Sequence, residues 1–98
     1  MPDNYIASLR LAQMELAANR YDDAIASCDR GLAHASGPLG RSWLMQVKAD
    51  ALLQSGQRAQ ARRVLRDALQ AVEEIALQGA RQRNVEKISK MLNGIPRG

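Results

Sequence analysis

An all-α fold is predicted for this chain of 98 residues on three observations. Ala, Leu, Gln and Arg, which form helices readily, are abundant, whereas aromatic residues make up only 3% of the sequence and Phe is absent. Apolar residues recur at steps of three and four, as they do along one face of a helix. Ser, Gly and Pro gather at a few places and separate these periodic segments.

The periodic segments predict five helices. They span about residues 6–18, 21–35, 41–54, 58–77 and 81–92. Residues 36–40 form the clearest break, in which Pro38 suits the start of a helix, and Gly79 is expected to end or kink the fourth helix. The five helices group into hairpins at about 5–36 and 40–78 and a capping helix at about 81–93, within a single domain covering 1–98.

Length and composition place the chain among soluble globular proteins. The sequence is 46% hydrophobic and 24% charged, which does not favour the disordered or membrane classes. No apolar run approaches the roughly 18 residues that a membrane span needs, and the first ten residues lack the pattern of a secretion signal. We therefore expect a cytoplasmic protein.

The two predicted hairpins align with one another at one constant offset. Ala12, Asn19, Tyr21, Ala24, Cys28, Gly31 and Leu32 fall opposite Ala49, Gly56, Arg58, Ala61, Leu65, Ala68 and Leu69. Each hairpin thus has small residues at matching places around a tight turn. Small side chains allow antiparallel helices to approach closely, so the spacing has a structural reason.

This pattern resembles the tetratricopeptide repeat (TPR) family over nearly the whole chain. Ala49, Gly56, Ala61 and Ala68 match the family pattern well, whereas the first hairpin has Asn19 in place of the turn glycine. The resemblance implies antiparallel hairpins stacked as a short right-handed α-solenoid, with about five helices. Because about three repeats are usually needed for stability, we also expect a homodimer or a part of a longer chain.

The resemblance implies a non-catalytic protein-protein interaction scaffold that binds a partner peptide or helix in a concave groove, or that self-associates. The groove residues it implies are Leu9, Gln13, Leu16, Trp43, Gln46, Asp50, Arg83, Glu86 and Lys90. Leu9 and Leu16 are equally well explained as core residues. For Trp43, burial between helices is favoured over a role as a partner anchor. The lysine and asparagine set with which some members hold a free carboxylate is missing.

Charge suggests an alternative function. Residues 1–54 have a net charge of −1 and residues 55–98 a net charge of +5. A basic face is predicted from Arg58, Arg62, Arg63, Arg66 and Lys87. Such a face could bind nucleic acid or an anionic surface, but no aromatic residue lies among these cations to stack on bases, so nucleic acid is the less favoured partner.

No catalytic, cofactor or metal site is predicted. His34 is the only histidine, and no glycine-rich phosphate loop occurs. His34 is expected near the end of a helix, where the helix dipole favours a cation, so a structural role is favoured for this side chain. Cys28 is the only cysteine and lies within a predicted helix, so we expect it to fill core space.

Overall fold

A computed structural model of the protein describes residues 5–74 and 78–95. These residues form five α-helices and no strand, which confirms the all-α prediction. The helices are α1 (Tyr5–Ala17), α2 (Tyr21–His34), α3 (Pro38–Gln54), α4 (Arg58–Glu73) and α5 (Gln78–Asn93). Within the described ranges, none of them is long and apolar enough to cross a membrane.

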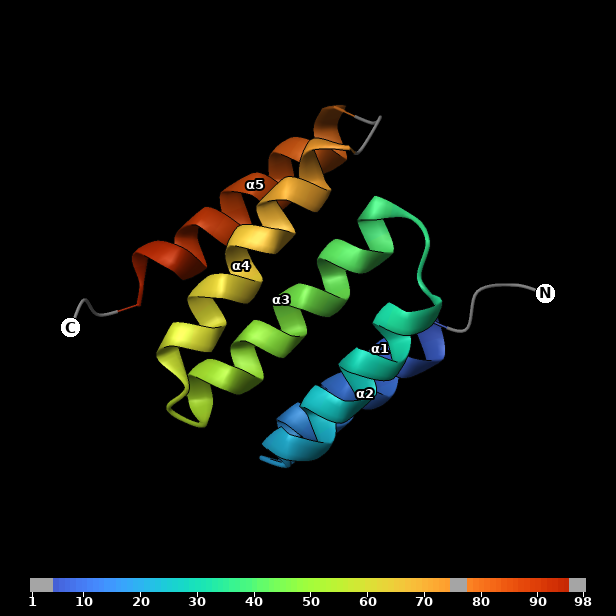
Figure 1. Ribbon diagram of the computed structural model, residues 1–98, viewed down its shortest axis with the longest axis vertical. Coiled ribbons are helices and arrows are strands. Elements are labelled where there is room, and N and C mark those ends of the chain that lie inside the picture. The colour runs from blue at the N-terminus through green and yellow to red at the C-terminus, as the bar shows by residue number, and fades with distance from the viewer. Residues whose placement is uncertain (1–4, 75–77, 96–98) are drawn as a thin grey trace.

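Each helix packs against the next one along the chain, and α1 also packs against α3. The helices form a row that begins with α1 and α2 and ends with α4 and α5 (Figure 1). In this view α1 and α5 lie behind α2 and α4, so α1 and α5 belong to the side of the molecule that faces away from the viewer. This arrangement leaves α3 in the middle of the molecule, between the first two helices and the last two.

The turns inside the two hairpins have the same backbone geometry. Asn19 and Gly56 both have positive φ, at 61° and 86°. In each turn the following residue, Arg20 or Gln57, donates its amide proton to the carbonyl five residues earlier, at 2.8 Å in both cases. This left-handed helix ending favours Gly and tolerates Asn, which accounts for the residues that occupy the two matching positions.

Four matching positions are buried in both hairpins. Three of them have small residues in both, namely Ala12 and Ala49, Ala24 and Ala61, and Gly31 and Ala68, whereas the fourth has Cys28 in the first hairpin and the larger Leu65 in the second. Gly31 lies where three helices meet, because a Cβ atom there would be 2.8 Å from the side chain of Leu44 and 3.0 Å from that of Ser8. The first hairpin therefore has glycine where the second accommodates alanine.

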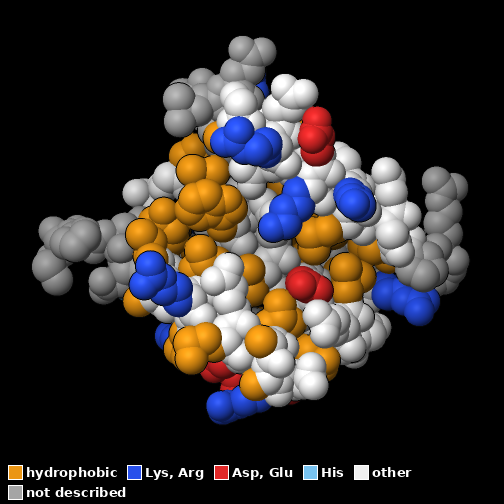
Figure 2. Space-filling view, turned by 180° about the vertical axis from the view of Figure 1, so that it is seen from behind, with side chains coloured by type: hydrophobic (Ala, Val, Ile, Leu, Met, Phe, Trp, Pro, Cys, Tyr) orange, Lys and Arg blue, Asp and Glu red, His pale blue; other side chains and the backbone are white. Residues whose placement is uncertain are grey.

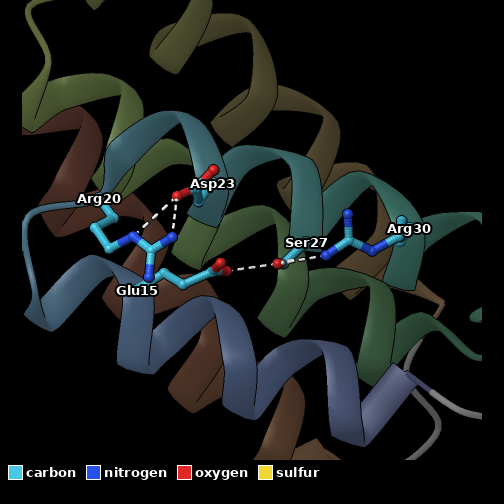
Figure 3. Close-up of polar contacts among 5 residues, drawn as sticks. All are labelled: Glu15, Arg20, Asp23, Ser27 and Arg30. Carbon is cyan, nitrogen blue, oxygen red and sulfur yellow. Dashed lines mark hydrogen bonds and ion pairs between the residues drawn. The ribbon is translucent and has the colours of Figure 1, made fainter.

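The hydrophobic core is concentrated in the second hairpin and α5. Its main cluster among the described residues consists of Ala49, Leu52, Ala61, Leu65, Ala68, Val72, Ile88 and Ile95. Among the described residues, the first hairpin buries only alanine and cysteine side chains as apolar core residues, and a polar contact also links its two helices. Ser27 of α2 donates a hydrogen bond of 2.5 Å to Glu15 of α1 (Figure 3). At and within α2, Ser27 accepts a hydrogen bond of 2.8 Å from Arg30, and Arg20 forms an exposed ion pair with Asp23 at 2.7 Å (Figure 3).

Three predicted boundaries are wrong. Helix α3 begins at Pro38, three residues earlier than expected, because proline at the first helical position lacks only an amide proton that has no partner there. Helix α4 ends at Glu73, followed by Glu74 as its C-cap, and negative charge at a helix C-terminus is unfavourable. The rest of the predicted fourth helix, residues 75–77, lies outside the described residues. Helix α5 begins at Gln78, three residues earlier than expected, so Gly79 does not end a helix but lies in the first turn of α5.

Candidate partner-binding groove

A hollow of about 350 Å³ lies where α1, α3 and α5 meet. Its lining residues are Leu9, Gln13, Trp43, Gln46, Val47, Asp50, Lys87 and Met91. A second hollow of about 380 Å³ adjoins it towards the start of α3 and is lined by Leu39, Trp43, Gln46, Ala80, Arg83, Asn84 and Lys87. Since Trp43, Gln46 and Lys87 line both, the two hollows form one groove. On the side opposite to that of Figure 1, apolar side chains gather in patches with Lys and Arg between them (Figure 2).

The groove brings together six of the nine side chains that the sequence predicted for it. Five of these line the first hollow, namely Leu9, Gln13, Trp43, Gln46 and Asp50, and Arg83 lines the second. Leu16 is half-buried and Glu86 and Lys90 are exposed, and these three line neither hollow. On α5 the structure instead places Lys87 and Met91 in the first hollow, each one residue beyond a predicted position.

The expectation that Trp43 is buried between helices is wrong. Its side chain is 38% exposed and forms a wall shared by both hollows. Its two neighbours along α3, Ser42 and Leu44, are both completely buried. Helix α3 packs against α1, α2 and α4, and Trp43, Val47 and Asp50 recur at helical spacing along a side of α3 that these contacts leave open.

A buried polar network joins α3 to α5 beneath the groove. Gln46 Nε2 donates to Ser42 Oγ at 2.9 Å and to Asn84 Oδ1 at 2.8 Å. Asn84 Nδ2 in turn donates to the backbone carbonyl of Ala80 at 2.8 Å. Gln46 was predicted as a groove contact, yet it is only 4% exposed and also holds α5 against α3. Sequence reasoning missed Asn84, because the hydrogen bond connects residues far apart in the chain.

The network leaves one buried polar atom of Gln46 without a partner. Among the described residues, no donor lies within hydrogen-bond distance of Gln46 Oε1. Rotating the Gln46 amide so that its oxygen and nitrogen change places does not remove the problem. Asn84 presents its oxygen to Gln46 and donates its nitrogen to Ala80, so two oxygens would then face one another. A buried acceptor without a donor costs about 1–3 kcal/mol, so a group that donates to Oε1 stabilises this site.

Charge is distributed unevenly along the groove. Lys87 and Arg83 are exposed on α5, and neither forms an ion pair within the part of the chain that the structure describes. Asp50 of α3 is half-buried, lines the first hollow together with Lys87, and accepts a hydrogen bond of 3.0 Å from Gln54. The α5 side of the groove therefore carries positive charge and the α3 side carries negative charge.

The predicted basic face divides into two places. Arg58, Arg63 and Arg66 are exposed on α4 and Arg62 is half-buried there. Lys87 lines both hollows of the groove.

The side chains considered for chemistry lie apart from the groove. Cys28 is completely buried in α2, which confirms its expected place in the core. Burial, followed by the negative charge of Asp29, raises the pKa of the Cys28 thiol to about 12. His34 is exposed in the last turn of α2. The described ranges contain no group of three or more His, Cys, Asp or Glu side chains that could hold a metal ion.

Comparison with known proteins adds no family assignment to this geometry. No family model, no curated protein and no solved structure matches the chain.

Proposed function

We propose that this protein is a non-catalytic protein-protein interaction module that holds a peptide or a helix of its partner in the groove between α1, α3 and α5. One observation carries the proposal. Side chains from three helices, Leu9 of α1, Trp43 and Val47 of α3, and Met91 of α5, provide apolar walls around an open hollow. Concave apolar sites with a few polar groups are the usual places where ligands bind.

A TPR-like right-handed solenoid is the architecture we propose for this module. Two independent structural features that recur in both hairpins support it. The turns share positive φ at Asn19 and Gly56, and the small positions that align in sequence are buried in both hairpins. The order of the stack also supports it, because the first helices of both hairpins and α5 line the same groove.

Site-specific photo-crosslinking tests the proposal. A photoreactive phenylalanine analogue replaces Trp43 in one variant and Arg63, an exposed residue of α4, in a control variant. Both are irradiated in lysate of the native organism. We expect a defined crosslinked protein from position 43 and not from position 63. A crosslinked dimer of the chain itself would identify a second copy as the occupant.

The alternative function uses the arginines of α4. If α4 binds nucleic acid or an anionic surface, crosslinks form at position 63 and disappear as the salt concentration rises, because such binding releases counterions. Crosslinks at position 63 alone would contradict the groove as the functional site.

A further inference from the structure

The groove combines an apolar hollow with cations on one side only. Leu9, Val47 and Met91 line the first hollow, and Arg83 lines the second. Lys87 lies between them, since it lines both. Lys87 and Arg83 are four residues apart on α5, which is about one helical turn or 6 Å along the axis. Exposed cations without a counter-ion near an apolar hollow favour a ligand that carries a carboxylate next to an apolar side chain.

The α3 side of the groove disfavours a second carboxylate. Asp50 of α3 lines the first hollow, and among the described residues only the amide of Gln54 bonds to it. A ligand carboxylate close to Asp50 would bring two like charges together. The charge pattern therefore favours a ligand with an acidic residue on one side of its apolar residue and a neutral or basic residue on the other side.

The buried acceptor of Gln46 indicates what kind of molecule carries these groups. Gln46 lines both hollows and has an amide oxygen without a donor. A peptide has an N–H group at every residue, so a segment that crosses the groove can present a donor near this oxygen whichever side chains it carries. The oxygen is buried, so this bond requires a small shift of side chains that line the hollows.

We propose that the groove selects a peptide segment in which an apolar residue occupies the first hollow and an Asp or Glu within about two residues of it pairs with Lys87 and Arg83. This inference rests on the proposed function and specifies its ligand. It assigns the two cations of α5 to partner selection, separately from the arginines of α4.

Peptide selection tests the inference. A displayed library of random peptides is selected on three forms of the full chain. They are the native form, the double variant R83E/K87E, and the control R58E/R63E, which changes charge by the same amount on α4. All four positions are exposed, so each variant is expected to fold, and circular dichroism checks this. We expect the native form and the control to select peptides with an acid on one side of an apolar residue.

Binding of the best peptide then gives the size of the effect. We expect affinity to fall roughly ten-fold or more in R83E/K87E and to stay within about two-fold in R58E/R63E. A peptide with Lys in place of its acid should recover binding to R83E/K87E. Peptides that bind without any acid preference, or equally well to both variants, would overturn this inference and leave the groove proposal intact. Failure to select any peptide would overturn both.

Discussion

The two hairpins have the same backbone geometry at their turns but differ in the side chains that pack between their helices. Both have a left-handed turn residue and the same sequence of buried small positions. The second hairpin buries Leu44, Leu52, Leu65 and Val72, whereas none of the leucines of α1 and α2 is buried. Turn geometry and small residues therefore determine how the helices meet, and large buried side chains determine how firmly they stay together.

This difference makes the first hairpin the less stable end of the molecule. Its largest buried apolar side chain is Cys28, and Leu11 and Met14 of α1 are exposed, the latter to 69%. Helices with little buried apolar surface open at lower free energy than the core of the same protein. The groove spans both regions, because α1 contributes Leu9 to a site whose other walls come from α3 and α5.

The largest expected effect compares two aligned core positions. Replacing Leu65 by Ala should lower the free energy of unfolding by about 2–5 kcal/mol, because it leaves a cavity in the main cluster. At the aligned position, Cys28→Ala removes a single heavy atom and should cost on the order of 1 kcal/mol. Urea unfolding followed by circular dichroism measures both. Equal losses would contradict the unequal distribution of stability.

The turns give the next contrast. Gly56 has φ of 86° and open space around its Cα, so Gly56→Ala imposes only backbone strain, at a cost of about 1–2 kcal/mol. Asn19 already has a side chain at φ of 61°, and its replacement by Ala should cost less than half as much. The same urea titration applies to both variants. A larger loss at Asn19 would mean that its hydrogen bond to Tyr21, and not the backbone, controls the first turn.

Gly31 tests how closely the first three helices approach. A methyl group at this position would meet Leu44 and Ser8, and overpacking costs about 1–3 kcal/mol. Alanine improves helix propensity by about 1 kcal/mol, so the net effect of Gly31→Ala should be a loss of about 1 kcal/mol. Gly79→Ala is the matched control, since its nearest neighbour lies at 3.5 Å and it should show no loss. Thermal unfolding that shows a gain for Gly31→Ala would contradict the close approach.

The smallest effect concerns pH. Because folding raises the pKa of the Cys28 thiol from 9.0 to about 12, the folded state binds this proton more tightly than the unfolded state. This contribution to stability is fully present below pH 9 and is lost as the pH rises towards 12. Between pH 9 and pH 12, the free energy of unfolding should therefore fall less in Cys28→Ala than in the native chain. An identical pH profile in the two proteins would show that burial does not hold this proton.

The sequence predicts most of the framework of the fold. The positions of Asn19 and Gly56 follow from the demand of a left-handed turn for Gly or Asn, and helix α2 begins at the predicted Tyr21. The small residues at matching positions also indicate which side of each helix is buried.

The groove is less predictable because it depends on tertiary contacts. The exposure of Trp43 depends on which sides of α3 its three neighbouring helices cover, and no local pattern reveals this. Likewise, Lys87 and Met91 line the groove because α5 has a rotation about its axis that is fixed by Asn84, whose partner Gln46 lies on another helix. A polar residue on an apolar helix face, as Asn84 is one turn before Ile88, is the only local signal of this contact.

Amide hydrogen exchange with and without the selected peptide tests the groove most directly. We predict that the peptide slows exchange in the segments of α1, α3 and α5 that contain Leu9, Val47 and Met91. The largest change is expected in α1, since the less stable hairpin gains most from a ligand that bridges it to α5. Protection confined to α4, with no change in α1, would contradict the groove as the binding site.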